Sequence, residues 1–456
     1  MMTKSKWPKI AATAVSAGVL SLGLSGAFAN AAPAPNGYPG YPKYTKHVNL
    51  TWWTWVPNFQ TEVKIFEHYY PSIHVHALTI PGSEYTKLLT VFAAHHGAPD
   101  VAMIEFDYLP QFIQTGGLMN ISKFLTPYKS QYPKWVWSEI SYNNHGVNGV
   151  YGVPEDTGAE GLFYSKSAFK KYHLTVPTTW SQYGSEAIKY HKLTGKPFAN
   201  FNVTDGAWIQ SLLWQGGVIP FHQVNGNTWK INFATPASVR ILTFWKKLVA
   251  AHAVTDIADW TPTWESDMGH GMWPTWFFSA WFPSEAFDKF ISKKSLAQQQ
   301  LTAALPPQWN PSHPTNSDLG GSTQAVTTQT KHPKAAELFA TFINTALPEL
   351  KHDVASTRFG GGGLYPADLR GTKIPQFHRS FPALEGQKAY SQVFAKASAM
   401  VNYRFEYSPW GTYFSNDLSV ALEKAFAGKE TISAALHSAQ NTLDQYARSQ
   451  GYRVTN

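Results

Sequence analysis

The stretch HVNLTWWTWVPNFQTEVKIFEHYYPSIHVHAL, residues 47–78, decides the fold class. Residues 47–55 are rich in β-branched and aromatic side chains, which predicts a strand. Residues 60–70 carry apolar side chains at helical spacing, and the predicted helix ends at Pro71. Residues 72–78 alternate between apolar and polar side chains and predict a second strand. A strand, a helix and a strand in this order are typical of an α/β protein.

The same alternation continues along the chain. Residues 84–95 and 109–116 are predicted helices that flank a buried strand at residues 100–104. Further helices are predicted at residues 165–172, 179–194, 236–252, 333–344, 418–426 and 431–450. Further strands are predicted at residues 150–153, 161–164, 279–282, 301–305 and 324–328.

Tryptophan is unusually abundant, with 18 residues in 456. Two groups of tryptophans are dense in the sequence; they comprise Trp52, Trp53 and Trp55 in the first strand, and Trp260, Trp264, Trp273, Trp276 and Trp281. An indole ring offers a large flat face and an N–H that needs a partner. Sugars and organic cations are the ligands that favour such faces.

The N-terminus has the features of an export signal. Three lysines precede an apolar segment at residues 10–24, and small residues follow at 27–31. We therefore expect residues 1–31 to be a signal peptide and residues 32–45, rich in Pro, Gly and Tyr, to be a linker. The chain has no cysteine. This excludes disulfides, thiolate metal sites and a lipid-accepting lipobox cysteine. From the signal peptide we expect an exported periplasmic or extracellular protein.

The charge pattern argues against nucleic-acid binding. The formal net charge is +8, but lysine and arginine are dispersed along the chain and form no run of five. Charged residues make up only 14% of the chain, against roughly 25% in ordinary soluble domains. We hypothesise that the protein works in acid, where carboxylates would lose their charge.

Ordered sequence blocks carry a family resemblance between about residues 46 and 447. The blocks are Ala98-Pro99-Asp100-Val101 with Gly116 to Ile121, Tyr151-Gly152-Val153-Pro154, Leu162 to Lys166, Val176 to Trp180, Gln215-Gly216-Gly217, Gly269 to Trp281, Leu305-Pro306 with Gly320-Gly321, and Phe426 to Thr431 with Ala435-Leu436 and Ala439-Gln440. In this order they resemble the extracellular solute-binding proteins, family 1, of ABC importers. The likeness is to the carbohydrate-binding group that includes maltose-binding protein.

This resemblance implies a type II periplasmic-binding-protein-like fold, with two α/β lobes, a hinge and a ligand cleft between the lobes. Lobe 1 is expected at residues 46–154 and 306–363, and lobe 2 at residues 155–305 and 364–456. The implied partners are a sugar or oligosaccharide and the permease subunits in the membrane. The resemblance implies a monomer without catalytic residues, metal or cofactor.

Four candidate ligand-binding residues lie in lobe 1 or on the first crossing between the lobes. Trp53 and Trp55 share one face at the carboxyl end of the first strand, where open α/β sheets bind ligands. Asp107 follows the third strand, and the resemblance implies that it accepts hydrogen bonds from sugar hydroxyls; Glu105 is the alternative. Asp156 lies on the crossing and is a further acceptor.

The other four candidates lie in the second half of the chain. Trp276 and Trp281 belong to the dense tryptophan group, and Trp281 matches the ring-bearing segment of the family best. Gly321 belongs to a turn of small residues whose backbone can approach a ligand closely. Tyr413 lies where family members offer another aromatic side chain.

Three alternative functions remain open from the sequence. A glycoside hydrolase would need two opposed carboxyl groups roughly 5–10 Å apart, and no recognised motif supplies such a pair. A polyamine would need an acidic, aromatic cage, which Glu105, Asp107, Glu155 and Asp156 could provide. A metal binder would need clustered ligands, and the group of Glu265, Asp267 and His270 matches no firm spacing.

Overall fold

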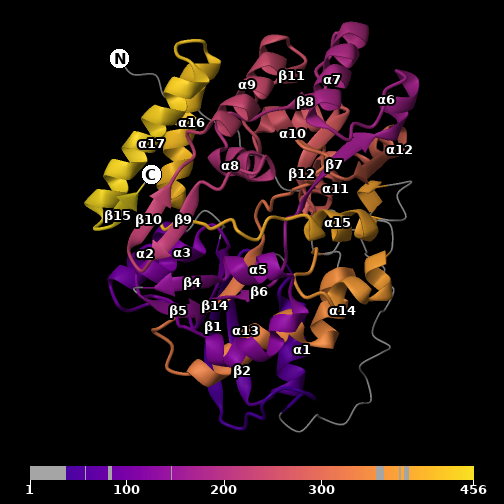
Figure 1. Ribbon diagram of the computed structural model, residues 1–456. Coiled ribbons are helices and arrows are strands. Elements are labelled where there is room, and N and C mark those ends of the chain that lie inside the picture. Colours follow the sequence, from indigo (N-terminus) through magenta and orange to yellow (C-terminus); the bar gives the residue numbers. More distant parts are fainter. Residues whose placement is uncertain are drawn as a thin grey trace, which may run out of the picture.

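The computed structural model describes residues 37–56, 58–80, 85–144, 146–355, 364–378, 382–384 and 390–455. The predicted signal peptide at residues 1–31 lies outside the described residues. Two lobes of mixed helix and strand lie one above the other, with the strands and helix of residues 48–79 in the lower lobe (Figure 1). No helix within the described ranges is long and apolar enough to cross a lipid bilayer.

The sheet of lobe 1 is built on residues 48–79. Its order is β2 (Ile73–Thr79), β1 (Val48–Thr54), β3 (Val101–Glu105), β14 (Ser322–Val326) and β6 (Val153–Pro154). Strand β1 pairs in parallel with β2 and β3, and β14 pairs antiparallel with β3 and β6. The predicted strand–helix–strand unit is therefore confirmed. Trp52 is fully buried in the core and donates its indole N–H to Gln324 at 2.8 Å.

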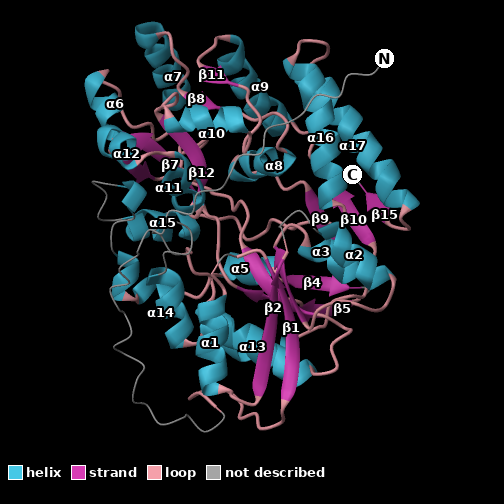
Figure 2. Ribbon diagram, turned by 180° about the vertical axis from the view of Figure 1, so that it is seen from behind, coloured by secondary structure: helices cyan, strands magenta, loops and turns pink. Residues whose placement is uncertain are grey.

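Helices cover both faces of this sheet, because parallel strands need crossover connections (Figure 2). The elements of lobe 1 around the sheet are α1 (Gln60–Tyr69), α2 (Tyr85–Ala93), α3 (Leu109–Gln114), α4 (Ser122–Leu125), α5 (Lys134–Glu139), the hairpin β4 (Ser141–Asn144) and β5 (Val147–Val150), α13 (Pro333–Thr345) and α14 (Leu347–Ala355).

Lobe 2 is built around a smaller antiparallel sheet with the order β12 (Thr275–Ser279), β7 (Glu160–Ser165) and β13 (Leu301–Ala304). Two further sheets join β8 (Ala199–Asn200) to β11 (Val254–Thr255), and β9 (Phe221–Asn225) to β10 (Thr228–Ile231) and β15 (Arg453–Thr455). The helices of this lobe are α6 (Lys166–Lys171), α7 (Trp180–Thr194), α8 (Gly206–Gln215), α9 (Pro236–Ala250), α10 (Pro262–Gly269), α11 (Asp288–Phe290), α12 (Lys293–Gln299), α15 (Tyr390–Ala399), α16 (Gly411–Phe426) and α17 (Ile432–Ser449).

Three extended segments run side by side where the chain passes between the lobes. Residues 155–160 lie in the middle and exchange backbone hydrogen bonds with residues 317–322 on one side and 365–367 on the other. The close packing requires glycine at position 158, since an added Cβ would lie 1.9 Å from the carbonyl oxygen of Leu319.

The contacts of residues 307–308 and 369 indicate where the chain passes from one lobe to the other. Pro307 accepts a hydrogen bond from Gln215 of α8, and Gln308 forms a bridge with Thr179 at the start of α7. The amide of Leu369 donates to Gln131 of lobe 1. We therefore propose that the chain leaves lobe 2 near residue 317 rather than at 306, and that residues 364–370 belong with lobe 1.

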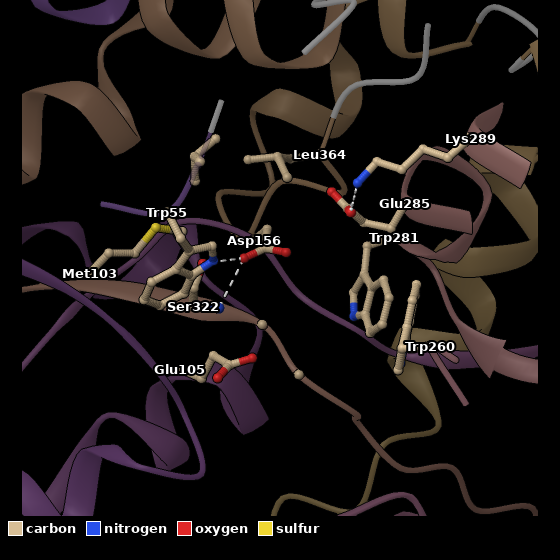
Figure 3. A pocket seen from close by; sticks show the side chains of 13 residues that line it. Trp55, Met103, Glu105, Asp156, Trp260, Trp281, Glu285, Lys289, Ser322 and Leu364 are labelled. Atoms are coloured by element: carbon tan, nitrogen blue, oxygen red, sulfur yellow. Dashed lines mark hydrogen bonds and ion pairs between the residues drawn. The ribbon is translucent and has the colours of Figure 1, made fainter. Parts of the chain in front are cut away.

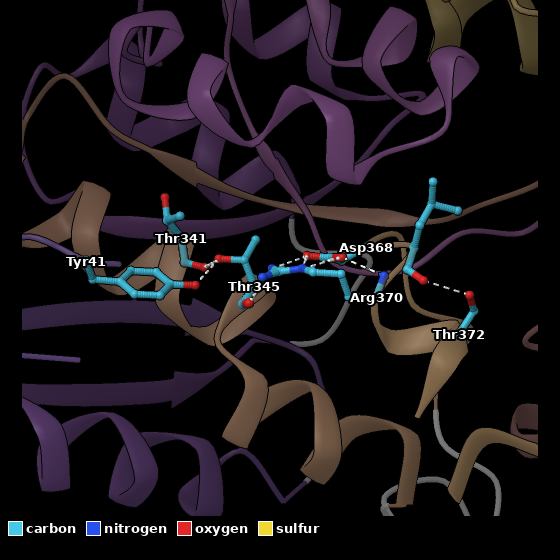
Figure 4. Close-up of polar contacts among 7 residues, drawn as sticks. Tyr41, Thr341, Thr345, Asp368, Arg370 and Thr372 are labelled. Carbon is cyan, nitrogen blue, oxygen red and sulfur yellow. Dashed lines mark hydrogen bonds and ion pairs between the residues drawn. The ribbon is translucent and has the colours of Figure 1, made fainter. Parts of the chain in front are cut away.

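The described part of the predicted linker packs against lobe 1. The hydroxyl groups of Tyr41 and Thr345 lie 2.7 Å apart (Figure 4). The Tyr41 ring lies 5.4 Å from that of Phe342 in α13. Arg370 bridges the same region, because its guanidinium donates to Asp368 and to the carbonyl oxygen of Thr345 (Figure 4). The third crossing and the N-terminal segment are thus tied to one end of α13.

Candidate ligand-binding site

A cavity of about 440 Å³ lies where the crossing segments meet both lobes. Its walls carry aromatic, acidic and small side chains; they are Trp55, Val56, Met103, Glu105, Asp156, Trp260, Trp281, Glu285, Lys289, Gly320, Gly321, Ser322 and Leu364. Trp55 and Met103 lie on one side of Asp156, and Trp260 and Trp281 lie on the other (Figure 3).

The aromatic walls come from the ends of two strands in different lobes. Trp55 follows β1 and is half-buried, with its ring edge-on to Tyr85 at 6.0 Å. Trp281 follows β12, and its ring stacks near that of Trp260 at 6.3 Å with an interplanar angle of 26°. Trp260 stays 44% exposed, so a flat face is available at the rim of the cavity. Aromatic faces on two sides of a cavity suit a flat, ring-shaped ligand.

The indole N–H of Trp281 has a structural partner. It donates to the carbonyl oxygen of Leu319 at 2.8 Å, and the hydroxyl of Ser279 donates to the same oxygen at 2.8 Å. This bond ties the ring to the second crossing segment. The ring is therefore held in place at the wall of the cavity, and its N–H is already engaged within the protein.

Asp156 forms the polar floor between these rings. One carboxylate oxygen accepts hydrogen bonds from the backbone N–H and the hydroxyl of Ser322, at 2.9 and 2.6 Å. Burial, followed by the nearby charge of Glu155, raises the pKa of Asp156 to about 7, although the Ser322 hydrogen bonds oppose the shift. A protonated carboxyl group can both donate to and accept from a neutral ligand.

Glu105 provides a second carboxyl group at the carboxyl end of β3. It is half-buried and accepts a hydrogen bond from the hydroxyl of Tyr85 at 3.0 Å. Burial raises the pKa of this carboxyl group as well. At the other rim, Lys289 forms an ion pair with Glu285 one helical turn away (Figure 3). The lysine charge is thus neutralised within the protein.

The turn at Gly320 and Gly321 brings backbone into the cavity. Both residues have positive φ, +77° and +82°, a conformation that glycine adopts without strain. An added Cβ at Gly321 would lie 2.6 Å from the ring of Phe106 and 3.1 Å from the backbone oxygen of Asp156. Glycine is therefore required here both by conformation and by space.

The structure brings four of the eight predicted residues to this cavity, namely Trp55, Asp156, Trp281 and Gly321. Trp53 shares the face of Trp55 but lies one pleat earlier, where the ammonium group of Lys87 is 4.8 Å from its ring centre. Asp107 is half-buried just past Glu105 and is not among the lining residues. Both stay predicted ligand contacts.

The other two predicted residues lie outside the cavity, because the elements that carry them differ from the predicted ones. The strand expected at residues 279–282 lies at 275–279, where both faces are buried, so Trp276 packs in the core against Phe287 at 5.0 Å. Helix α16 begins at residue 411 instead of 418, so Tyr413 lies in its first turn. Its ring stacks on Tyr446 of α17 at 3.8 Å.

Sequence reasoning did not select several residues that line the cavity, including Trp260, Met103, Glu285, Lys289 and Leu364. Trp260 was visible only as a member of the tryptophan group. Its positive φ of 61°, which turns the loop before α10, is a property of the fold with no signal in the sequence. Glu285 and Lys289, four residues apart, do form a recognisable helical ion pair.

A possible metal-ligating group lies elsewhere. In the part of the chain that the structure describes, donor atoms of Glu62, His352 and Asp353 lie within 4.8 Å of one another between α1 and α14. Each of these side chains already interacts with other groups of the protein. None of them lines the cavity at the crossing.

Comparisons with known proteins agree on one family. The family model described as bacterial extracellular solute-binding protein matches residues 52–346. An arabinooligosaccharide-binding protein of Halalkalibacterium halodurans is 25% identical over 310 residues, and one of Bacillus subtilis is 23% identical over 306. Each alignment covers 64% of this chain, and they cover 66% and 68% of those proteins, so about two thirds of each relative is spanned.

Solved structures extend the similarity over most of the chain. An ABC-transporter-associated binding protein from B. animalis subsp. lactis, solved with β-1,6-galactobiose, is 25% identical with a TM-score of 0.76. The galacto-N-biose-/lacto-N-biose I-binding protein from Bifidobacterium longum is 22% identical, also with a TM-score of 0.76. Each similarity covers 90% of this chain and 100% of the other. The two-lobe type II fold expected from the sequence is confirmed.

Proposed function

The chain belongs to the bacterial extracellular solute-binding protein family, and from this membership we propose that it captures a short neutral oligosaccharide and delivers it to an ABC importer. One observation carries the proposal. Trp55 of one lobe and the Trp260–Trp281 pair of the other face the same cavity, with the carboxyl group of Asp156 between them (Figure 3). Rings can cover the two faces of a sugar, while carboxyl groups bind its hydroxyls.

The protonation of the carboxyl groups favours a neutral ligand over a polyamine. A cation site is built from ionised carboxylates, whereas burial raises the pKa values of Asp156 and Glu105 above their usual range. The one lysine at the rim is paired with Glu285 among the described residues. We therefore place a polyamine second to a sugar.

The names of the relatives define the first ligands to test. These names give arabino-oligosaccharides, β-1,6-galactobiose and lacto-N-biose as the ligands of the relatives, and all of them are short chains of neutral sugars. A cavity of about 440 Å³ lies within the usual range of small-molecule sites, roughly 300–1,000 Å³. We propose a ligand that fits a cavity of about 440 Å³. We further propose that the protein acts as an exported monomer and that permease subunits contact both of its lobes.

The experiment is a thermal-shift screen of the chain from residue 32 onwards. The panel contains arabinobiose and arabinotriose, β-1,6-galactobiose, lacto-N-biose, maltose, spermidine and divalent metals. Stabilisation by one of the sugars supports the proposal, because a ligand that binds only the folded state raises the unfolding temperature. Stabilisation by spermidine or a metal alone would refute it.

The same samples separate binding from hydrolysis. After overnight incubation, chromatography of the stabilising sugar should return it intact, since the proposal assigns no catalytic pair of carboxyl groups. Release of monosaccharide would favour an exported glycoside hydrolase. Asp156→Asn is the matched variant for this incubation. It removes the carboxyl group but keeps a hydrogen-bonding group of the same size at the floor of the cavity.

A further inference from the structure

A second hollow, of about 280 Å³, lies between the lobes and shares no lining residue with the first. It is bounded by α5 and the β4–β5 hairpin from lobe 1 and by β9, β10 and residues 406–407 from lobe 2. In both overall views β4, β9 and β10 gather on one side of the molecule, and α11, next to the first cavity, lies on the other (Figures 1 and 2).

Direct contacts hold the two walls of this hollow together. The side-chain amide of Gln223 on β9 donates to the backbone oxygen of Asn143 on β4 at 2.8 Å. The rings of Tyr142 and Trp229, one from each lobe, lie 6.1 Å apart with an interplanar angle of 31°. An occupant of the hollow would therefore touch both lobes and would be linked to their relative arrangement.

Two buried polar groups in the walls have no partner among the described residues. Glu139 is only 8% exposed, yet neither of its carboxyl oxygens has a hydrogen-bond partner there. Trp229 is 1% exposed, and its indole N–H is likewise unpartnered. Nearly all buried polar groups in native proteins have a hydrogen-bond partner, so two unpartnered groups in the walls of one hollow point to an occupant that can hydrogen-bond with them.

The unpartnered groups are of complementary kinds. Burial, followed by the charges of Asp318 and Asp107, raises the pKa of Glu139 well above its usual range, so the carboxyl group can donate as well as accept. The indole of Trp229 only donates. Most of the other lining side chains carry hydroxyl or amide groups, and no lysine, arginine or histidine is among the described lining residues. The one further carboxyl group among them, that of Glu406, accepts a hydrogen bond from the backbone N–H of Gln223 and pairs with the ring of His222.

We propose that this hollow is an accessory binding site for a neutral polyol the size of a single sugar ring, with Glu139 and Trp229 hydrogen-bonding its hydroxyls and Tyr142 covering a face. A water molecule takes about 30 Å³ in the liquid, so 280 Å³ has room for several waters or one monosaccharide. The walls offer aromatic surface, donors and acceptors together, which is the combination that a sugar ring requires.

The test is equilibrium dialysis of the chain from residue 32 onwards with radiolabelled L-arabinose, D-galactose, D-glucose and myo-inositol, and with D-glucosamine as the cationic counterpart of D-glucose. Glu139→Leu removes both hydrogen-bonding oxygens, and Glu139→Gln keeps one acceptor and one donor without a charge. Trp281→Ala alters the first cavity only. Circular dichroism and the thermal midpoint confirm that each variant is folded, and Tyr407→Phe gives a second, milder change in the same wall.

We expect one of these polyols to bind, and Glu139→Leu to weaken its binding by about tenfold or more, the effect of losing hydrogen bonds in a buried site. Glu139→Gln should stay within about threefold of the natural chain, because the proposal needs a hydrogen-bonding group and no charge. Trp281→Ala should leave this binding unchanged, whether or not the first cavity binds an oligosaccharide.

Three results would overturn the proposal. One is the absence of binding by every polyol at millimolar concentration. A second is loss of binding in Trp281→Ala with none in Glu139→Leu, which would place the polyol in the first cavity. The third is preference for D-glucosamine over D-glucose together with loss of binding in Glu139→Gln, which would show recognition of a cation by an ionised carboxylate.

Discussion

Raising the pH should destabilise this protein, because its buried carboxyl groups hold their protons more tightly in the folded state. Asp156 is 7% exposed, and burial with the charge of Glu155 raises its pKa from 3.8 to about 7. Glu160 is fully buried at the start of β7, and burial raises its pKa to about 8 against hydrogen bonds from Ser317 and Ser211. Both shifts have the same sign.

The direction follows from proton linkage. Below about pH 4 both groups are protonated in the folded and the unfolded chain, and neither lowers stability. Between about pH 4 and about pH 7 the unfolded chain releases protons that the folded chain retains, so unfolding becomes easier as pH rises. Each group then lowers the free energy of unfolding by about 1.4 kcal/mol per pH unit. For Asp156, whose pKa is raised from 3.8 to about 7, the total loss of stability across this pH range is about 4 kcal/mol.

The assay is urea unfolding without ligand at half-unit steps between about pH 4 and about pH 8. The natural chain should be most stable at the acidic end. Asp156→Asn should reduce the slope of stability against pH by about 1.4 kcal/mol per unit up to about pH 7, and Glu160→Gln by a similar amount. A stability that rises with pH, or slopes that are unchanged in both variants, would refute this account of the buried carboxyl groups.

Three further predictions concern the first cavity. Trp281→Ala should weaken oligosaccharide binding by about tenfold, or about 1.4 kcal/mol, through lost ring contact, as measured by calorimetry; an unchanged affinity would remove Trp281 from the site. Gly321→Ala should lower the free energy of unfolding by about 1–3 kcal/mol and should also weaken ligand binding. Gly428→Ala is the control, because Gly428 has φ +77° and open space around it, so this change should lower stability alone. Equal effects of the two changes on binding would contradict the role of the turn. Gly158→Ala should shift the crossing and lower binding and thermal midpoint together, because the added Cβ would meet the Leu319 carbonyl at 1.9 Å; wild-type values would contradict the packing of the crossing.

The fold could be predicted from the sequence wherever local pattern and burial agree. Strand β1 and helix α1 occur where alternation and helical spacing place them, and the helices expected at 179–194 and 333–344 are α7 and α13. The lobe boundaries that we propose differ from those expected from the sequence. Residues 306–316 have no periodic pattern, and only their contacts with α7 and α8 associate them with lobe 2.

The site was predictable where it depends on the ends of strands or on the crossing. Trp55 and Asp156 were accessible in this way, and both line the cavity. Trp276 could not be placed in this way, because the strand begins at residue 275 instead of the predicted 279 and puts the side chain of Trp276 in the core. Nor could Tyr413, because α16 begins seven residues earlier than its apolar pattern shows. Glu139 carries no signal in the sequence, since its lack of a partner depends on the packing of two lobes.

The pKa values of the buried carboxyl groups Asp156 and Glu160 are raised, so we expect the folded chain to be most stable at low pH. This supports the hypothesis that the protein works at low pH. In most proteins surface carboxylates are paired and ionised, and acid removes their contribution. Here Asp156 and Glu160 at the crossing are buried and their pKa values are raised, and charged residues are scarce throughout the chain. Composition and site chemistry therefore point in the same direction.

The central claim is that the two lobes hold a neutral sugar chain between tryptophan rings and return it unchanged. Isothermal titration of the chain from residue 32 onwards with the sugar selected by the thermal screen tests it most directly. We predict binding at one site in the first cavity, a clear loss of affinity in Trp281→Ala and in Trp55→Ala, and intact sugar after the titration. Binding that neither tryptophan affects, or cleavage of the sugar, would contradict the account.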